Sequence, residues 1–167
     1  MRSIFLALLV VSCTAAFSQQ PSKPNPSEIY EKIQKLNFLG SVLYVAAHPD
    51  DENTRLISLL ANDTKARTAY LSMTRGDGGQ NLIGPEIREL LGVIRTQELQ
   101  GARSIDGGEQ LFTRANDFGY SKHPDETLQI WNKNEVLHDV VWAIRKFRPD
   151  VIINRFDHRT PGKTHGK

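Results

Sequence analysis

Two spacings of apolar residues alternate along the chain. Short, mainly apolar runs predict four strands, of which the first and the last are expected to be buried: 41–47, 67–74, 110–113 and 151–154. Around and between them, apolar residues recur every three or four positions. This spacing predicts amphipathic helices at 28–36, 52–61, 86–104 and 126–147.

Alternating strands and helices predict the fold class. Right-handed crossovers of this kind build a mostly parallel sheet covered by helices on both faces, an α/β Rossmann-like three-layer sandwich. Ligands of such sheets bind beyond the carboxyl ends of the strands. Polar loops follow three of the predicted strands directly, namely HPDDE, the glycine-rich RGDGGQN at 75–81, and RFDHR. We therefore expect these loops to meet at one edge of the sheet.

The N-terminus predicts export. Arg2 precedes an apolar run and then small residues, which is the pattern of a secretory signal peptide. We expect a signal peptide at 1–18, a proline-rich linker at 19–27 and one α/β domain at 28–167, with a periplasmic or extracellular location and no transmembrane segment in the mature chain. The alternative is a lipid anchor on Cys13, since Val10-Val11-Ser12-Cys13 resembles a lipobox.

Charge and cysteine content narrow the chemistry. The chain has 21 basic and 19 acidic residues without a basic cluster, so we expect no nucleic-acid partner. Its one cysteine, Cys13, lies in the predicted leader. A metal site in the mature domain must therefore use histidine, aspartate and glutamate side chains.

The stretch HPDDE, at 48–52, has two interpretations. Carboxylates at the start of a helix cap free N–H groups and offset the macrodipole. One cap is sufficient, however, and capping explains neither His48 nor Pro49. The functional alternative is a site for zinc or another divalent metal, with His48 and Asp51 as ligands and Asp50 as general base. A third ligand is not local, so the residues alone leave both interpretations open.

Five motifs follow one another in a recognisable order: AAHPDDE, TRGDGGQN, RTQEL, NDFG and PDVIINRF. From Ser41 to the C-terminus the chain thereby resembles the PIG-L or LmbE-like deacetylase family. Members are zinc-dependent enzymes that remove acetyl or related acyl groups from N-acyl glucosamine conjugates. The resemblance implies deacetylation of N-acetylglucosamine-type conjugates, and a small-molecule or glycan substrate that carries an N-acyl amino sugar.

The resemblance also implies roles for individual residues. His48 and Asp51 match zinc ligands, and Asp50 matches the base that takes a proton from the metal-bound water. Arg95 and Asp117 match residues that contact substrate. Without the resemblance, Arg95 is equally well explained as part of a solvated helix face, and Asp117 as an Asx turn before the next glycine.

The C-terminal segment matches the family incompletely. His165 corresponds to the first histidine of a His-x-x-His pair and is implied to stabilise the tetrahedral oxyanion. The second histidine, the third zinc ligand, falls one position beyond Lys167. Lys163 stands where the family often has tyrosine, and His158 is either a substitute ligand or a solvated loop residue. We therefore expect a C-terminally incomplete deacetylase domain with little or no activity.

Three other functions compete with this interpretation. An amidase for another N-acyl conjugate would use the same residues, because specificity lies in loops. A non-catalytic sugar-binding module would keep the pocket, but this hypothesis would not explain the presence of Asp50. A nucleotide-binding domain is excluded, since the loop after the first strand carries acids where a phosphate needs glycines and N–H groups.

Overall fold

The computed structural model describes residues 23–121 and 123–157. These residues belong to two compact units, with the boundary after residue 34. Each unit is described on its own. The second contains the sheet and all predicted site residues that the structure describes.

In the described part of the first unit, the chain forms helix α2 (Pro26–Lys35), whose last residue lies just past the boundary. Asn25 caps this helix, because its Oδ1 accepts a hydrogen bond from the N–H of Glu28 at 2.9 Å. The Glu28 carboxylate accepts one in return from the N–H of Asn25 at 3.0 Å. This reciprocal pair is a capping box, which satisfies two N–H groups at the helix start.

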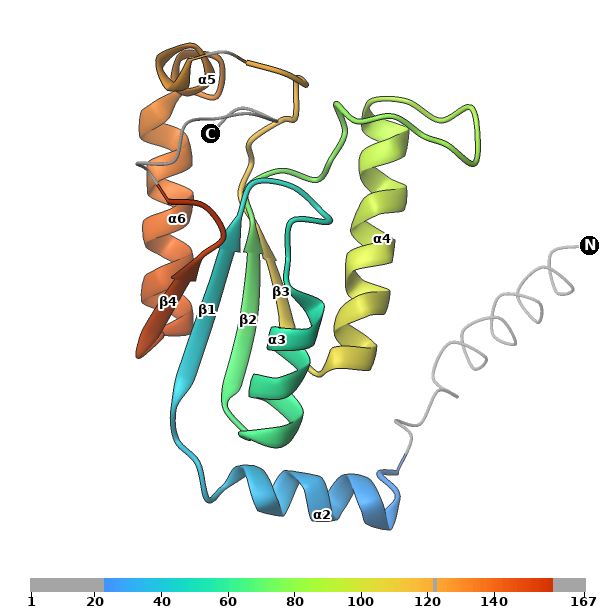
Figure 1. Ribbon diagram of the computed structural model, residues 1–167, viewed down its shortest axis with the longest axis vertical. Coiled ribbons are helices and arrows are strands. Elements are labelled where there is room, and N and C mark those ends of the chain that lie inside the picture. The colour runs from blue at the N-terminus through green and yellow to red at the C-terminus, as the bar shows by residue number, and fades with distance from the viewer. Residues whose placement is uncertain (1–22, 122, 158–167) are drawn as a thin grey trace, which may run out of the picture. The chain divides into compact units, whose positions relative to one another are not determined.

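The second unit is built on a four-stranded parallel sheet with the order β3–β2–β1–β4 (Figure 1). The predicted strands are all present: β1 (Ser41–Ala46), β2 (Arg67–Ser72), β3 (Glu109–Phe112) and β4 (Val151–Asn154). In the central pair, Ser41 stands opposite Arg67 and Ala46 opposite Ser72. The mostly parallel α/β fold predicted from the sequence is thereby confirmed.

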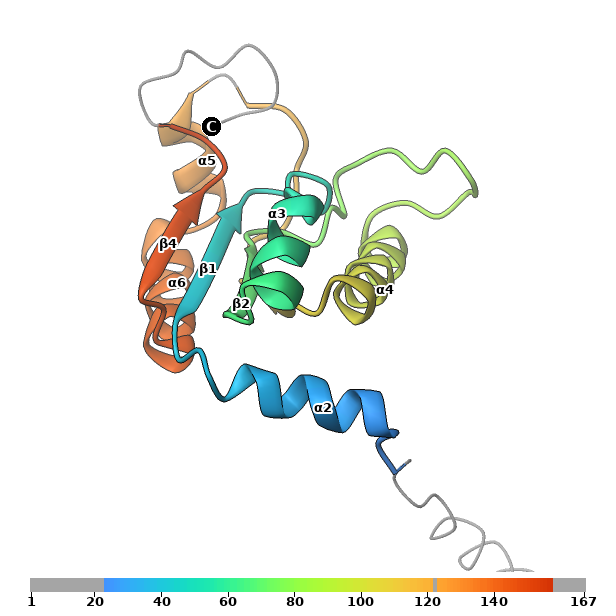
Figure 2. The same cartoon turned by 60° about the horizontal axis from the view of Figure 1, so that its bottom comes forward.

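Helices cover both faces of this sheet. They are α3 (Thr54–Ser58), the π-helix η1 (Leu59–Asp63), α4 (Glu89–Asp106), α5 (Pro124–Ile130) and α6 (Lys133–Phe147). Figure 2 shows α3 and α4 on one face of the sheet and α6 on the other. The arrangement is therefore the three-layer sandwich expected from alternating strands and helices.

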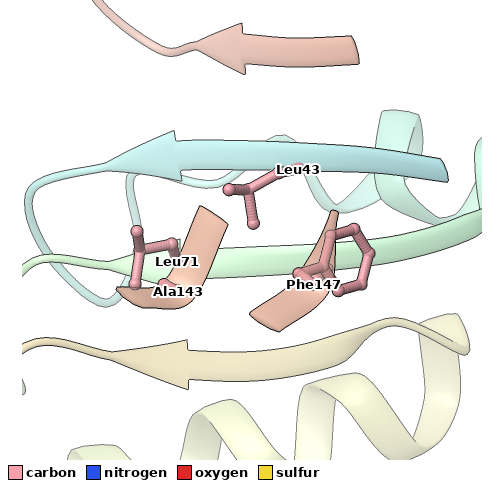
Figure 3. Packing of buried hydrophobic residues seen from close by; sticks show 5 residues of the cluster. Leu43, Leu71, Ala143 and Phe147 are labelled. Carbon is pink, nitrogen blue, oxygen red and sulfur yellow. The ribbon is translucent and has the colours of Figure 1, made fainter. Parts of the chain in front are cut away.

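Alternate residues of the strands form two separate cores. Leu43 and Leu71 point to one face and pack against Ala143 and Phe147 of α6 (Figure 3). Their neighbours Tyr44 and Tyr70 point to the other face, where Ile57 of α3 and Leu99 of α4 meet them. This alternation follows from the two-residue period of a strand and fixes the orientation of both helix layers.

One strand differs from its prediction. β4 was expected to be buried, but three of its four residues are exposed. It pairs only with β1 and so lies at an edge of the described sheet, where burial on both faces is not required.

Two helices also differ from their predictions. The segment 126–147 is not one helix, because α5 ends at Ile130 and α6 begins at Lys133. Asn132 lies between them with φ 58°, a left-handed conformation that interrupts a helix. The helix predicted from residue 52 begins at Thr54, and Asn53 caps it through a 3.1 Å bond from the N–H of Leu56. The acids at 50–52 therefore precede the helix and do not cap it.

Candidate active site

The loops that follow β1, β2 and β3 converge on one cavity of about 500 Å³. The cause is the parallel sheet, which brings the carboxyl ends of all its strands to the same edge. Five ionisable residues predicted from the sequence line this cavity together: His48, Asp50, Asp51, Arg95 and Asp117.

His48 and Asp51 form a tight turn directly after β1. Nδ1 of His48 lies 3.3 Å from Oδ2 of Asp51, and the same oxygen accepts the main-chain N–H of His48 at 3.0 Å. The hydroxyl of Tyr70, on β2, donates to the carbonyl of His48. The main chain and the ring of His48 are therefore both fixed, and two potential metal donors stand side by side.

This contact shifts the pKa values of both residues. The hydrogen bond that the His48 ring donates to Asp51 raises the pKa of His48 above its usual value, against the effect of burial, and the carboxylates of Asp117 and Asp50 add to the rise. Burial by itself would raise the pKa of Asp51. Hydrogen bonds from the ring and main chain of His48 outweigh it, so the pKa of Asp51 lies below its usual value. The turn thus favours an ionised carboxylate.

Asp117 reaches the site from the loop after β3. Its Oδ1 lies 3.8 Å from Nε2 of His48 and also accepts the N–H of Gly119 at 2.9 Å. The Asx turn considered for this residue is therefore present, and it aims the carboxylate at the cavity. The N–H of Asp117 donates to Asp77 of the glycine-rich loop at 3.1 Å. A Cβ on Gly78 would lie 2.4 Å from the carbonyl oxygen of Asp117, so only glycine permits this approach.

Asp50 and Arg95 meet at the rim of the cavity. Oδ2 of Asp50 lies 3.2 Å from Nη2 of Arg95, which also donates to the carbonyl of Pro49. The side chain of Asp50 is 72% exposed and that of Arg95 27%. Arg95 therefore does not belong to a solvated helix face. It connects α4 to the HPDDE turn.

Other predicted residues lie outside the part of the chain that the structure describes. These are the signal segment with Cys13, the possible ligand His158 and the oxyanion residue His165. Within 23–121 and 123–157, no group of three histidine, cysteine, aspartate or glutamate side chains could hold a metal ion. His48 and Asp51 are the predicted donors that the structure places together.

The sequence interpretation missed a buried network behind the HPDDE turn. Glu52 lies 3.3 Å from Arg103 of α4, whose guanidinium also binds Asp106 at 2.6 Å. All three side chains are at most 7% exposed. Arg103 and Asp106, three residues apart on a helix, suggest only a surface pair, so no local signal indicated that they face the site.

Two solved structures show a similar fold. The N,N′-diacetylchitobiose deacetylase from Pyrococcus horikoshii has a TM-score of 0.58 and 19% identity, over 87% of this chain and 55% of that one. The 4-carboxy-2-hydroxymuconate hydratase from Pseudomonas putida has a TM-score of 0.52 and 19% identity, over 68% and 46%. The chain thus spans about half the length of each. At this identity the likeness establishes the fold alone, and the two enzymes catalyse different reactions.

The family comparison is more specific. No curated protein matches the chain. The model of the PIG-L family, described as GlcNAc-PI de-N-acetylase, matches residues 43–166, which include most of β1, the HPDDE turn and every loop around the cavity. The chain belongs to the PIG-L family.

Proposed function

We propose that the protein is a metal-dependent hydrolase that deacetylates N-acetylglucosamine-type amino-sugar conjugates. The observation that carries the proposal is the 3.3 Å separation of His48 Nδ1 and Asp51 Oδ2 at a cavity that also holds Asp50. Membership of the PIG-L family and the fold shared with a deacetylase support it.

The two donors fit zinc. Ligands at roughly 2.0–2.1 Å from a tetrahedral zinc ion stand about 3.3 Å apart, which is the separation found here. An imidazole nitrogen and a carboxylate oxygen are also ligand types that zinc accepts. The proposal requires a third protein donor from outside the described residues. Asp117 faces Nε2, the other ring nitrogen of His48. A carboxylate at this position favours a proton on Nε2 and orients the ring.

The predicted cavity residues each have a role in the proposed hydrolysis. Bound zinc would polarise the acyl carbonyl and acidify a water molecule. Asp50 would take a proton from the attacking water, whose oxygen then bonds to the carbonyl carbon. The carbon–nitrogen bond breaks, and Asp50 returns the proton to the leaving nitrogen, giving acetate and a free amino sugar. Arg95 holds the carboxylate of Asp50 at the rim and would contact the sugar, and His165 would stabilise the oxyanion.

Metal content and acetate release test the proposal together. We expect the chain extended by the third donor histidine to bind one zinc ion and to release acetate from an N-acetylglucosamine glycoside, and the chain to Lys167 to do both only weakly. A chelator should abolish the activity, and added zinc should restore it. Asp50→Asn should keep the zinc and lower kcat by about 10²- to 10⁴-fold, whereas His48→Ala should lose the zinc. Asp63→Asn, an exposed carboxylate at the end of η1, is the control.

Three results would contradict parts of the proposal. Zinc binding that survives His48→Ala would place the metal elsewhere. Sugar binding without acetate release would favour the non-catalytic binding module. Hydrolysis of another N-acyl conjugate in preference to the sugar would keep the mechanism and change the substrate class.

A further inference from the structure

Glu52, the last residue of HPDDE, uses both of its carboxylate oxygens inside the protein. Oε1 lies 3.3 Å from Nη2 of Arg103, and Oε2 accepts the main-chain N–H of Asp50 at 2.9 Å. The side chain is only 6% exposed. Glu52 therefore joins helix α4 to the backbone of the residue proposed as the general base.

Arg103 is a firm anchor for this carboxylate. Its Nε and Nη2 bind Asp106 at 3.0 and 2.6 Å, its Nη1 donates to Gln110 at 3.2 Å, and its guanidinium lies 5.4 Å from the ring centre of Tyr70. Such charge-assisted, bidentate bonds are the strongest that side chains make. A buried cation with partners on every side has one stable position, so the oxygen of Glu52 that contacts Arg103 is held in place.

The backbone of Asp50 needs such support. Its φ is 121°, a backbone conformation that residues other than glycine rarely adopt. Strain of this kind persists only where surrounding contacts enforce it. The Asp50 N–H, which donates to Glu52, and the Pro49 carbonyl, which accepts from Arg95, belong to the same peptide group, directly before the Cα of Asp50, so the two bonds together fix the orientation of that peptide plane.

We propose that Glu52 is a positioning residue: anchored by Arg103 and Asp106, its carboxylate fixes the strained backbone at Asp50 and thereby the direction of the Asp50 side chain. This inference rests on the proposed function, because the direction matters for catalysis only if Asp50 is the base. Glu52 itself does not line the cavity.

Glu52→Gln is the sharpest test. A carboxylate accepts from both Arg103 and Asp50, whereas an amide of the same shape has one acceptor oxygen and must release one of the two. We expect a kcat about 10- to 100-fold lower, because a misplaced base reacts slowly, with KM and zinc content unchanged. The Asp50 amide proton, followed by NMR in the metal-free protein, should exchange faster. Glu109→Gln is the matched control, since it breaks a pair with Arg67 that is half-exposed and outside the cavity.

The outcomes separate this inference from the proposed function. Unchanged exchange at Asp50, or unchanged kcat, in Glu52→Gln overturns the inference even if the wild-type protein hydrolyses its substrate. If the wild-type protein shows no hydrolysis, the proposed function fails first, and the exchange measurement alone decides whether Glu52 fixes the Asp50 backbone. Should Glu52→Gln fold poorly, Arg103→Lys replaces it, since lysine cannot bridge Glu52, Asp106 and Gln110, and the same pattern is expected.

Discussion

Close approach between two backbones shapes the cavity at the level of single residues. Gly78, in the loop after β2, passes so near Asp117 that a Cβ there would lie 2.4 Å from its carbonyl oxygen and 2.8 Å from its Oδ1. Neither atom can retreat freely, because the Asp117 carboxylate is bound by the N–H of Gly119 and lies near His48. Glycine is therefore required at position 78 because no side chain fits there, and the shape of the site depends on this residue.

Gly78→Ala should accordingly destabilise the protein by about 1–3 kcal/mol, the usual cost of forcing extra atoms into a packed region. It should also lower activity, because Asp117 must move. Gly101→Ala is the matched control. Gly101 lies exposed within α4, and a methyl group there would meet no heavy atom within 4 Å, so alanine should stabilise the protein by about 0.5–1 kcal/mol. Chemical denaturation of both variants measures the difference, and equal effects would contradict the argument.

At the residue scale, the sequence indicates proximity where residues are close along the chain. His48, Asp50 and Asp51 lie within a few positions of the end of a strand, and they line one cavity in the structure, while their roles remain predictions. The partner of Glu52 is 51 residues away, on a helix. Neither spacing nor residue type signals such a pair, because only the packing of α4 against the sheet brings it together.

At the scale of elements, an ion pair ties α6 to the loop that carries Asp117. Asp139 of α6 accepts hydrogen bonds from Arg114, one from its main-chain N–H and two from its guanidinium, at 2.8–2.9 Å. These bonds hold the pKa of the Asp139 carboxyl well below its usual value. The loop from Arg114 to Asp117 therefore takes part of its position from α6.

The lowered pKa gives this contact a defined pH dependence. The folded state binds the Asp139 proton less readily than the unfolded chain, so its stabilising effect is complete above the unfolded pKa of about 3.9 and is lost as the pH falls toward the folded pKa. Asp139→Asn should lower stability by about 0.5–1 kcal/mol at pH 7, and this deficit should shrink below about pH 4. Thermal unfolding from pH 3 to 7 measures it, with Asp63→Asn as control. A deficit independent of pH would contradict the assignment.

Element prediction worked for every strand and failed at helix ends. The strands coincide with short apolar runs of four to eight residues bounded by polar or turn residues, the pattern from which they were predicted. The break between α5 and α6 lies at Asn132, whose left-handed backbone coincides with a bond from the Trp131 indole to the carbonyl of Asn116. That bond depends on the loop after β3. The helical periodicity on either side therefore did not reveal the break between the two helices.

At the scale of the whole molecule, the fold and the family do not specify the substrate. The substrate is selected by the residues of the site. A deacetylase and a hydratase share this architecture, so the scaffold positions loops without choosing a reaction. Within the described residues, no helix is long and apolar enough to cross a membrane. The export of the protein, expected from residues 1–18, remains a prediction.

The expected export can be tested at the N-terminus of the protein. We expect cleavage before Gln19, because Ala16 and Ser18 are small residues at the positions a signal peptidase reads, and the apolar run before them is too short to span a bilayer. Intact mass measurement on the protein isolated from its native cells should find a mature N-terminus at Gln19 in the exported fraction. Cys13→Ser should leave mass and location unchanged. A lipid-modified Cys13 at the N-terminus, lost in Cys13→Ser, would establish the anchored form instead and place the cavity at a membrane surface, where a lipid-linked amino sugar becomes an accessible substrate.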